Sequence, residues 1–158
     1  MKRPPVLPVI IGTGFGAGFW PWGPGTAGAV LATLIWGVLV WLLGLDTTVL
    51  VTMVLIIVFT ALGTWATARL QPYWGDDPSR VVVDEMVGVW IPLLMAENWW
   101  QALLALLLFR LFDIVKPFGI RSIDNRKGAF WVMFDDIVAG VYAVVSLLVI
   151  ETIVLWIS

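Results

Sequence analysis

The chain contains no cysteine and no histidine, and only 13% of its 158 residues are charged. Without cysteine it has no disulfide framework, and without either residue type it has no Cys/His zinc site. The absence of histidine also excludes His-dependent catalytic dyads and triads, and any phosphohistidine intermediate. Any chemistry in this chain therefore depends on carboxylates, lysine, arginine, hydroxyl groups and the backbone.

An excess of positive charge is also lacking, because the formal net charge is −2. Nucleic-acid-binding domains carry a basic patch or stripe, so we expect no nucleic-acid partner. Hydrophobic residues make up 61% of the chain, which is typical of integral membrane proteins. We expect one membrane-embedded domain covering residues 1–158, built from α-helices because an open sheet edge cannot be satisfied in lipid.

Long apolar runs predict where this chain crosses the membrane. A membrane-spanning helix needs about 20 apolar residues, with a lower limit of about 17. Residues 26–45, 47–68 and 136–157 meet that requirement. Two shorter runs, at 81–96 and 99–115, predict either two short spans or a re-entrant hairpin. We therefore expect about four to five transmembrane helices, and favour five.

The distribution of charge predicts the orientation of these helices. With five spans and the N-terminus inside, all nine basic residues lie at one end, and cytoplasmic loops are the ones enriched in Lys and Arg. The opposite end receives only Asp46, Glu97 and Glu151. The Gly/Pro-rich N-terminal loop at 12–29 precedes the first span and lies on the cytoplasmic side. A re-entrant hairpin would move Glu97 and the C-terminus inward and leaves the span count open.

Ionisable residues that border membrane helices are costly and are therefore functional candidates. Three clusters meet this description: Asp84 and Glu85, then Arg110, Asp113 and Lys116, then Asp135 and Asp136. Simpler explanations exist for each cluster, because acids stabilise a helix N-terminus and basic side chains reach from a helix to the membrane surface. The convergence of all three clusters and the N-terminal loop on one membrane face favours a functional site.

The residue types in these clusters suit phosphate chemistry. Carboxylates can hold Mg²⁺, which commonly uses one or two of them together with substrate phosphate. Guanidinium and ammonium groups neutralise phosphate oxygens, and amides of a glycine-rich loop can cradle an anion. Such a set is sufficient for phosphoryl transfer, in which the protein mostly positions groups and stabilises charge. The residues predict phosphate chemistry at the inner membrane surface without choosing the reaction.

Four segments of the sequence indicate which reaction this is, because together they resemble the phosphatidylglycerophosphatase A family. In order along the chain they read "GFGAGFWPWGPGTAGA", "DPSRVVVDEMVG", "FRLFDIVKPFGI" and "VMFDDIVAG". The resemblance implies a membrane enzyme of phospholipid biosynthesis in the bacterial inner membrane. It also implies Mg²⁺-dependent hydrolysis of the terminal phosphate of phosphatidylglycerophosphate, which yields phosphatidylglycerol and inorganic phosphate at the cytoplasmic face.

The resemblance also implies roles for individual residues. The implied catalytic residues are Asp84, Glu85, Asp113 and Asp136. The implied substrate-binding residues are Gly25, Thr26, Arg110 and Lys116. The implied metal ligands are Asp84, Glu85, Asp135 and Asp136. The family usually has a histidine in the approach to the last Asp pair, and this chain has none.

Three other functions remain as alternatives to this enzyme. A small cation transporter or channel could use the buried carboxylates, although the charges stay near one face whereas an ion path should continue across the bilayer. A CDP-alcohol phosphotransferase-like lipid enzyme is less favoured, because the long aspartate motif of that family is missing. A non-catalytic scaffold would tolerate the loss of Asp84 or Asp136.

Overall fold

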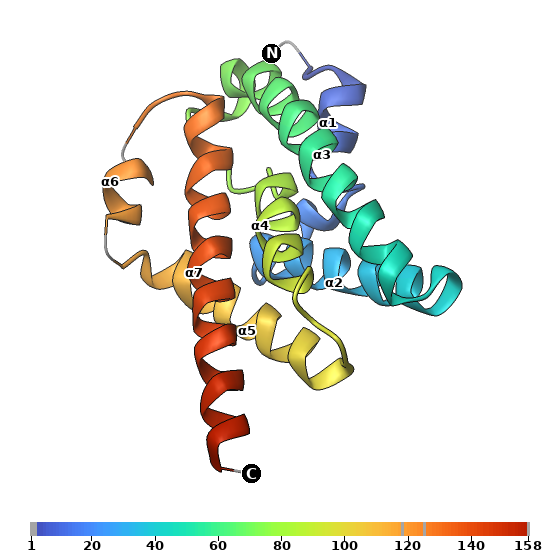
Figure 1. The fold of residues 1–158 in the computed structure, drawn as a ribbon. Coiled ribbons are helices and arrows are strands. Elements are labelled where there is room, and N and C mark those ends of the chain that lie inside the picture. Colours follow the sequence, from blue (N-terminus) through green and yellow to red (C-terminus); the bar gives the residue numbers. More distant parts are fainter. Residues whose placement is uncertain (1–2, 118, 125, 158) are drawn as a thin grey trace.

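The structure is a computed structural model that describes residues 3–117, 119–124 and 126–157. In it the chain folds into a bundle of helices (Figure 1). No strand occurs in those ranges, which confirms the all-α prediction. The elements are α1 (Val6–Gly12), η1 (Ala17–Phe19), α2 (Pro24–Leu43), α3 (Leu45–Trp74), α4 (Val83–Leu93), α5 (Trp99–Val115), α6 (Ile120–Asp124) and α7 (Ala129–Ile157).

Three of these helices, α2, α3 and α7, are long and apolar enough to cross a membrane. The two shorter apolar runs form α4, with 11 residues, and α5, with 17. At 1.5 Å per residue α4 is about 16 Å long, well below the ~30 Å hydrocarbon thickness. It is one of the two short elements that the sequence predicted, and at this length it does not form one of the five favoured spans.

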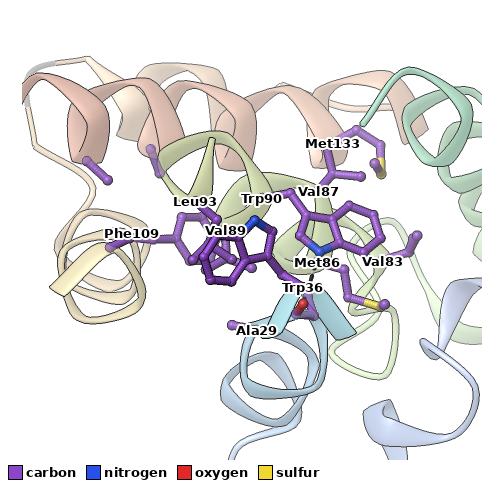
Figure 2. Packing of buried hydrophobic residues seen from close by; sticks show 14 of the residues in the cluster. Ala29, Trp36, Val83, Met86, Val87, Val89, Trp90, Leu93, Phe109 and Met133 are labelled. Atoms are coloured by element: carbon purple, nitrogen blue, oxygen red, sulfur yellow. Dashed lines mark hydrogen bonds between the residues drawn. The ribbon is translucent and has the colours of Figure 1, made fainter. Parts of the chain in front are cut away.

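The short helix α4 lies at the centre of the bundle, in contact with α2, α3, α5 and α7. Nine of its 11 residues are buried, so hardly any of its surface faces the surroundings. Figure 2 shows Trp36 of α2, Trp90 of α4, Phe109 of α5 and Met133 of α7 in this core. The indole N–H of Trp90 donates to the carbonyl of Ala32 at 3.0 Å, which ties α4 to α2.

Two glycines set the close contact between α4 and α7. A Cβ on Gly88 would lie 2.4 Å from the Phe109 ring and 2.8 Å from the Asp136 carbonyl oxygen, while one on Gly140 would lie 2.4 Å from the Gly88 carbonyl. Small residues at such a crossing let helix backbones approach closely. Asp84 and Asp136 each precede one of these glycines by four residues, about one turn. The crossing therefore brings the two carboxylates together.

Candidate functional site

A cavity of about 480 Å³ lies where the start of α2, the start of α4, the end of α5 and the beginning of α7 meet. Two loops, at 76–81 and 126–127, complete its wall. Most of the charged residues that the sequence singled out line this cavity: Asp84, Glu85, Arg110, Asp113, Lys116, Asp135 and Asp136. Gly25 is also part of the wall.

Three carboxylates converge inside the cavity. One oxygen from each of Asp84, Glu85 and Asp136 lies within 4.8 Å of the others. Asp84 and Asp136 are buried, and Glu85 is half-buried. Two oxygens of these residues, Oδ1 of Asp84 and Oε2 of Glu85, are buried without a hydrogen-bond partner in the described part of the chain. Because buried polar atoms are normally paired, these oxygens fit a bound cation.

The two α4 carboxyls also have perturbed acidities. Burial, with the neighbouring Glu85 charge as the next cause, raises the pKa of Asp84 well above its usual range. Burial likewise raises the pKa of Glu85 to about 7. These directions mean that the negative charges are poorly stabilised by the protein alone. A nearby cation would stabilise them, which agrees with the unpaired oxygens.

Arg110 extends from α5 toward the carboxylate group. Its Nη1 pairs with Oδ2 of Asp113, one turn later on the same helix, and lies 3.9 Å from Oε1 of Glu85. The Nε of Arg110 is buried without a partner in the described residues. The guanidinium is thus held by one close acid while retaining donor capacity toward the cavity. Such a planar group suits phosphate oxygens.

Lys116 reaches the cavity because α5 ends there. Pro117 follows and has no N–H for a further helical hydrogen bond, and Lys116 itself adopts a left-handed conformation at φ 48°. Its Nζ lies 2.6 Å from Oδ2 of Asp135 on α7. A non-glycine residue in this conformation costs of order 1 kcal/mol. The ion pair fixes the ammonium group beside the three carboxylates.

The first turn of α2 forms the wall opposite α5. Pro24 starts the helix after Gly23, whose φ of 143° is closed to most residues. A Cβ on Gly25 would lie 2.0 Å from Oε1 of Glu85 and 3.2 Å from Nη1 of Arg110. A side chain at this position would therefore collide with the site. Gly25 is needed so that the helix can approach Glu85.

Two predicted residues have neighbours other than those expected. Asp135, expected among the metal ligands, pairs with Lys116 and is not part of the group formed by Asp84, Glu85 and Asp136. Thr26, expected to bind substrate, is exposed and lines a separate apolar groove instead of the cavity. The geometry thus divides the predicted set into a carboxylate group, a cationic pair with its acids, and one residue outside the cavity.

Sequence reasoning missed the outer rim of the cavity. None of the three clusters found in the sequence includes Asp76, Asp77, Arg126 or Lys127, yet all four line the cavity. Nζ of Lys127 lies 3.2 Å from Oδ2 of Asp76, and both side chains are well exposed. No signal in the sequence pairs these two loops, which are separated by 50 residues. They meet because α3 and α7 bring their flanking ends together.

Acidic and basic side chains line the cavity in unequal numbers. Seven carboxyl groups and four basic side chains form its wall. A phosphate monoester adds up to about two more negative charges. The basic side chains of Arg110 and Lys116 would offset part of that charge.

Comparison with known proteins gives a consistent assignment. Residues 10–151 match the family model described as phosphatidylglycerophosphatase A. A Haemophilus influenzae protein of that name is 35% identical over 90% of this chain and 87% of its own length. An Escherichia coli protein, also named phosphatidylglycerophosphatase A, is 34% identical over 84% of this chain and 76% of its own.

A further relative carries a different name. A Bacteroides thetaiotaomicron protein with the provisional name phosphatidylinositol-3-phosphatase is 54% identical over 94% of this chain and 96% of its own length. No solved structure matches the chain at a significant level. The family match covers nearly the whole chain, including every residue of the cavity wall. The chain is a bacterial-type membrane phosphatase and belongs to the phosphatidylglycerophosphatase A family.

Proposed function

We propose that this protein hydrolyses the terminal phosphate monoester of phosphatidylglycerophosphate, yielding phosphatidylglycerol and inorganic phosphate, with Mg²⁺ as cofactor. The observation that carries the proposal is the group of Asp84, Glu85 and Asp136, whose oxygens converge within 4.8 Å beside two cationic side chains. The family match and the names of the relatives from H. influenzae and E. coli support this choice of substrate.

The donor set at the site fits Mg²⁺. This ion prefers oxygen ligands and usually takes one or two carboxylates together with water and substrate phosphate. Asp84, Glu85 and Asp136 would hold it, since their oxygens converge and two oxygens of this group have no partner in the described protein. When bound, Mg²⁺ supplies positive charge next to the phosphoryl oxygens.

The remaining residues position the phosphate. Arg110 and Lys116 neutralise its oxygens, while Asp113 and Asp135 hold these two cations in place. The reaction forms a bond from water oxygen to phosphorus and breaks the bond from phosphorus to the glycerol oxygen. The carboxyl groups of the cavity can take up the proton that water loses and return one to the departing glycerol oxygen.

The basic residues around the cavity support a cytoplasmic orientation of the site. The cavity is lined by Arg110, Lys116, Arg126 and Lys127, four of the nine basic residues in the chain. Cytoplasmic loops are enriched in such residues, so we place the site at the cytoplasmic face of the bacterial inner membrane. A path for ions across the membrane has less support, because the α4 residues that follow Glu85 are buried in a hydrophobic core.

Phosphatidylinositol 3-phosphate is a second candidate substrate, favoured by the 54% identity to the relative from B. thetaiotaomicron. Both lipids present a phosphate monoester on a headgroup that follows a phosphodiester. The chemistry at Asp84, Glu85 and Asp136 would be the same for either. The difference lies in the headgroup, a linear glycerol in one lipid and an inositol ring in the other.

The decisive experiment measures phosphate release by the purified protein in detergent micelles. Both lipids are supplied separately, with Mg²⁺ or with EDTA. We expect release from phosphatidylglycerophosphate that requires Mg²⁺ and exceeds release from phosphatidylinositol 3-phosphate. Faster release from the inositol lipid would replace the proposed substrate. Release that is equal in EDTA would remove Mg²⁺ from the proposal, and no release from either lipid by folded protein would overturn the function.

A further inference from the structure

An apolar groove of about 440 Å³ lies on the outer side of α2, next to the cavity. Its lining is largely hydrophobic or aromatic: Trp20, Trp22, Gly23, Thr26, Ala27, Val30, Leu31 and Leu34. Trp22 is 86% exposed and Leu34 62% exposed, so apolar side chains here face the surroundings. In a membrane protein such a surface meets lipid, and a groove in it gives one chain more contact than a flat face does.

The groove and the cavity are neighbours through Gly23, which lines both. The first turn of α2 separates them. Pro24 and Gly25 face the charged cavity, while Thr26 and Ala27 face the groove. A molecule whose phosphate lies beside Arg110 can therefore continue past Gly23 into the apolar groove.

The length of the groove matches one leaflet of a membrane. Residues from Gly23 to Leu34 cover 11 steps of a helix, which is about 16 Å at 1.5 Å per residue. Half of the hydrocarbon core of a bilayer is about 15 Å thick. Trp20 and Trp22 stand at the end nearer the cavity, with ring centroids 5.9 Å apart. Tryptophan prefers the boundary between headgroups and hydrocarbon, which places that end of the groove at the level of the glycerol backbone.

We propose that this groove binds an acyl chain of the phospholipid substrate, so that α2 recognises both halves of the lipid. The inference rests on the proposed function, since it assumes a phospholipid phosphate in the cavity. The charged cavity fits the headgroup, the tryptophan pair fits the backbone region, and the groove fits the hydrocarbon. Thr26, which lies outside the cavity, then contacts the lipid where its headgroup joins the chains.

The test compares two substrates that share a headgroup but differ in their chains. Dioleoyl phosphatidylglycerophosphate fills the groove, whereas the dibutyryl form is too short to do so. Val30→Trp places a large side chain in the groove. We expect the ratio of kcat/KM for the long-chain to the short-chain substrate to fall about tenfold, the effect of losing roughly two buried methylene groups.

Val54→Trp is the matched control. It is the same substitution on α3, at a residue that is 58% exposed and does not line the groove. We expect the substrate ratio of this variant to equal that of the wild type. An equal fall in both variants, or no fall in Val30→Trp, means that the groove takes only bulk lipid and overturns the inference. A drop in the mass of the solubilised particle with an unchanged ratio would identify an interface between copies instead.

A second test introduces a thiol into the groove, so that the protein folds before any large group is attached there. The chain has no cysteine, so Val30→Cys carries a single thiol. Alkyl methanethiosulfonates of increasing length then fill the groove of already folded protein. The substrate ratio should fall as the alkyl group lengthens, and a constant ratio would contradict the proposal. If the wild type hydrolyses neither substrate, the proposed function itself has failed, which this design distinguishes from an unchanged ratio.

Discussion

Polar side chains pair with one another around Gln101 at one end of the helix bundle, whereas several polar side-chain atoms at the cavity end have no partner in the described residues. At the end far from the cavity, Oδ1 of Asn98 accepts a hydrogen bond from the backbone N–H of Gln101 at 3.1 Å. Oε1 of Gln101 accepts from the Glu97 amide at 2.7 Å, and its Nε2 donates to Oε1 of Glu151 at 2.6 Å. The bond to Glu151 ties α5 to α7, and together these bonds engage both the oxygen and the nitrogen of the Gln101 side-chain amide.

At the cavity end, hydrogen-bonding capacity is left over. Asp84 and Glu85 each keep a buried oxygen without a partner in the described residues, and Arg110 keeps its Nε. A buried group without a partner costs about 1–3 kcal/mol, so a protein rarely holds several together without a ligand. Polar groups that are paired internally support the fold, whereas unpaired ones that converge indicate where a ligand binds.

The largest effect on activity is expected from a pair of substitutions, one at each end of the bundle. Asp136→Asn removes a charge from the three-carboxylate group and should lower kcat/KM about 10³-fold, in the range found for losing a key electrostatic group. Its melting temperature should not fall, because the change also relieves repulsion among buried acids. Glu151→Gln should leave kcat/KM unchanged. Phosphate release and thermal unfolding in detergent measure both, and comparable activity losses would remove the distinction between the ends.

A matched pair of glycine variants sharpens the contrast within α2. Gly25→Ala places a Cβ 2.0 Å from Oε1 of Glu85, and the displacement should lower kcat/KM about 10²-fold, as misplacement by about 1 Å can do. Gly37→Ala meets no atom within 4 Å and should only stabilise the helix, by about 0.5–1 kcal/mol. Kinetics and melting temperature separate the two outcomes. Normal activity of Gly25→Ala would show that the helix can move away without cost.

Arg110→Lys is expected to have a smaller effect. The positive charge remains near Asp113 and Glu85, but the planar fork that suits phosphate oxygens is lost. We expect kcat/KM to fall about tenfold, or about 1.4 kcal/mol of transition-state stabilisation. Steady-state kinetics measure this directly, with Arg80→Lys as control because Arg80 does not line the cavity. Equal effects in both variants would argue against a phosphate role for Arg110.

The smallest effect on catalysis is expected from Gln101→Leu. It breaks the bonds to Glu97 and Glu151 and should cost about 1–3 kcal/mol of stability. The value of kcat/KM for the folded protein should stay at that of the wild type. Thermal unfolding and activity measured on the same sample test this, and an activity loss with normal stability would contradict a purely structural role.

Much of the site could be predicted from the sequence because charge is costly near apolar helices. Asp84, Glu85, Arg110, Asp113, Lys116 and Asp136 all line one cavity, as expected from their shared membrane face. The end of α5 also has a local cause in the sequence, because Pro117 lacks the N–H for a further helical hydrogen bond. These conclusions need only local sequence rules and the placement of charge.

The rest depended on how the helices are rotated and packed. Neighbouring residues on a helix point about 100° apart, so the sequence could not tell which of Asp135 and Asp136 faces α4. The crossing at Gly88 and Gly140 decides this and turns Asp136 toward Asp84. The rotation of α2 likewise turns Thr26 toward the groove. Long-range packing of this kind leaves no local signal in the sequence.

The central position of α4 has a consequence for biogenesis. A helix of 11 residues cannot stay in the bilayer by itself, and its cover comes from α2, α3, α5 and α7. We expect the acidic pair to enter the membrane only after α7, the last helix, has been synthesised. Chains truncated before α7 should leave the region around Asp84 open to proteases, whereas full-length chains protect it. A newly made chain would thus gain its carboxylate cavity in its final assembly step, which keeps incomplete chains from acting on lipid.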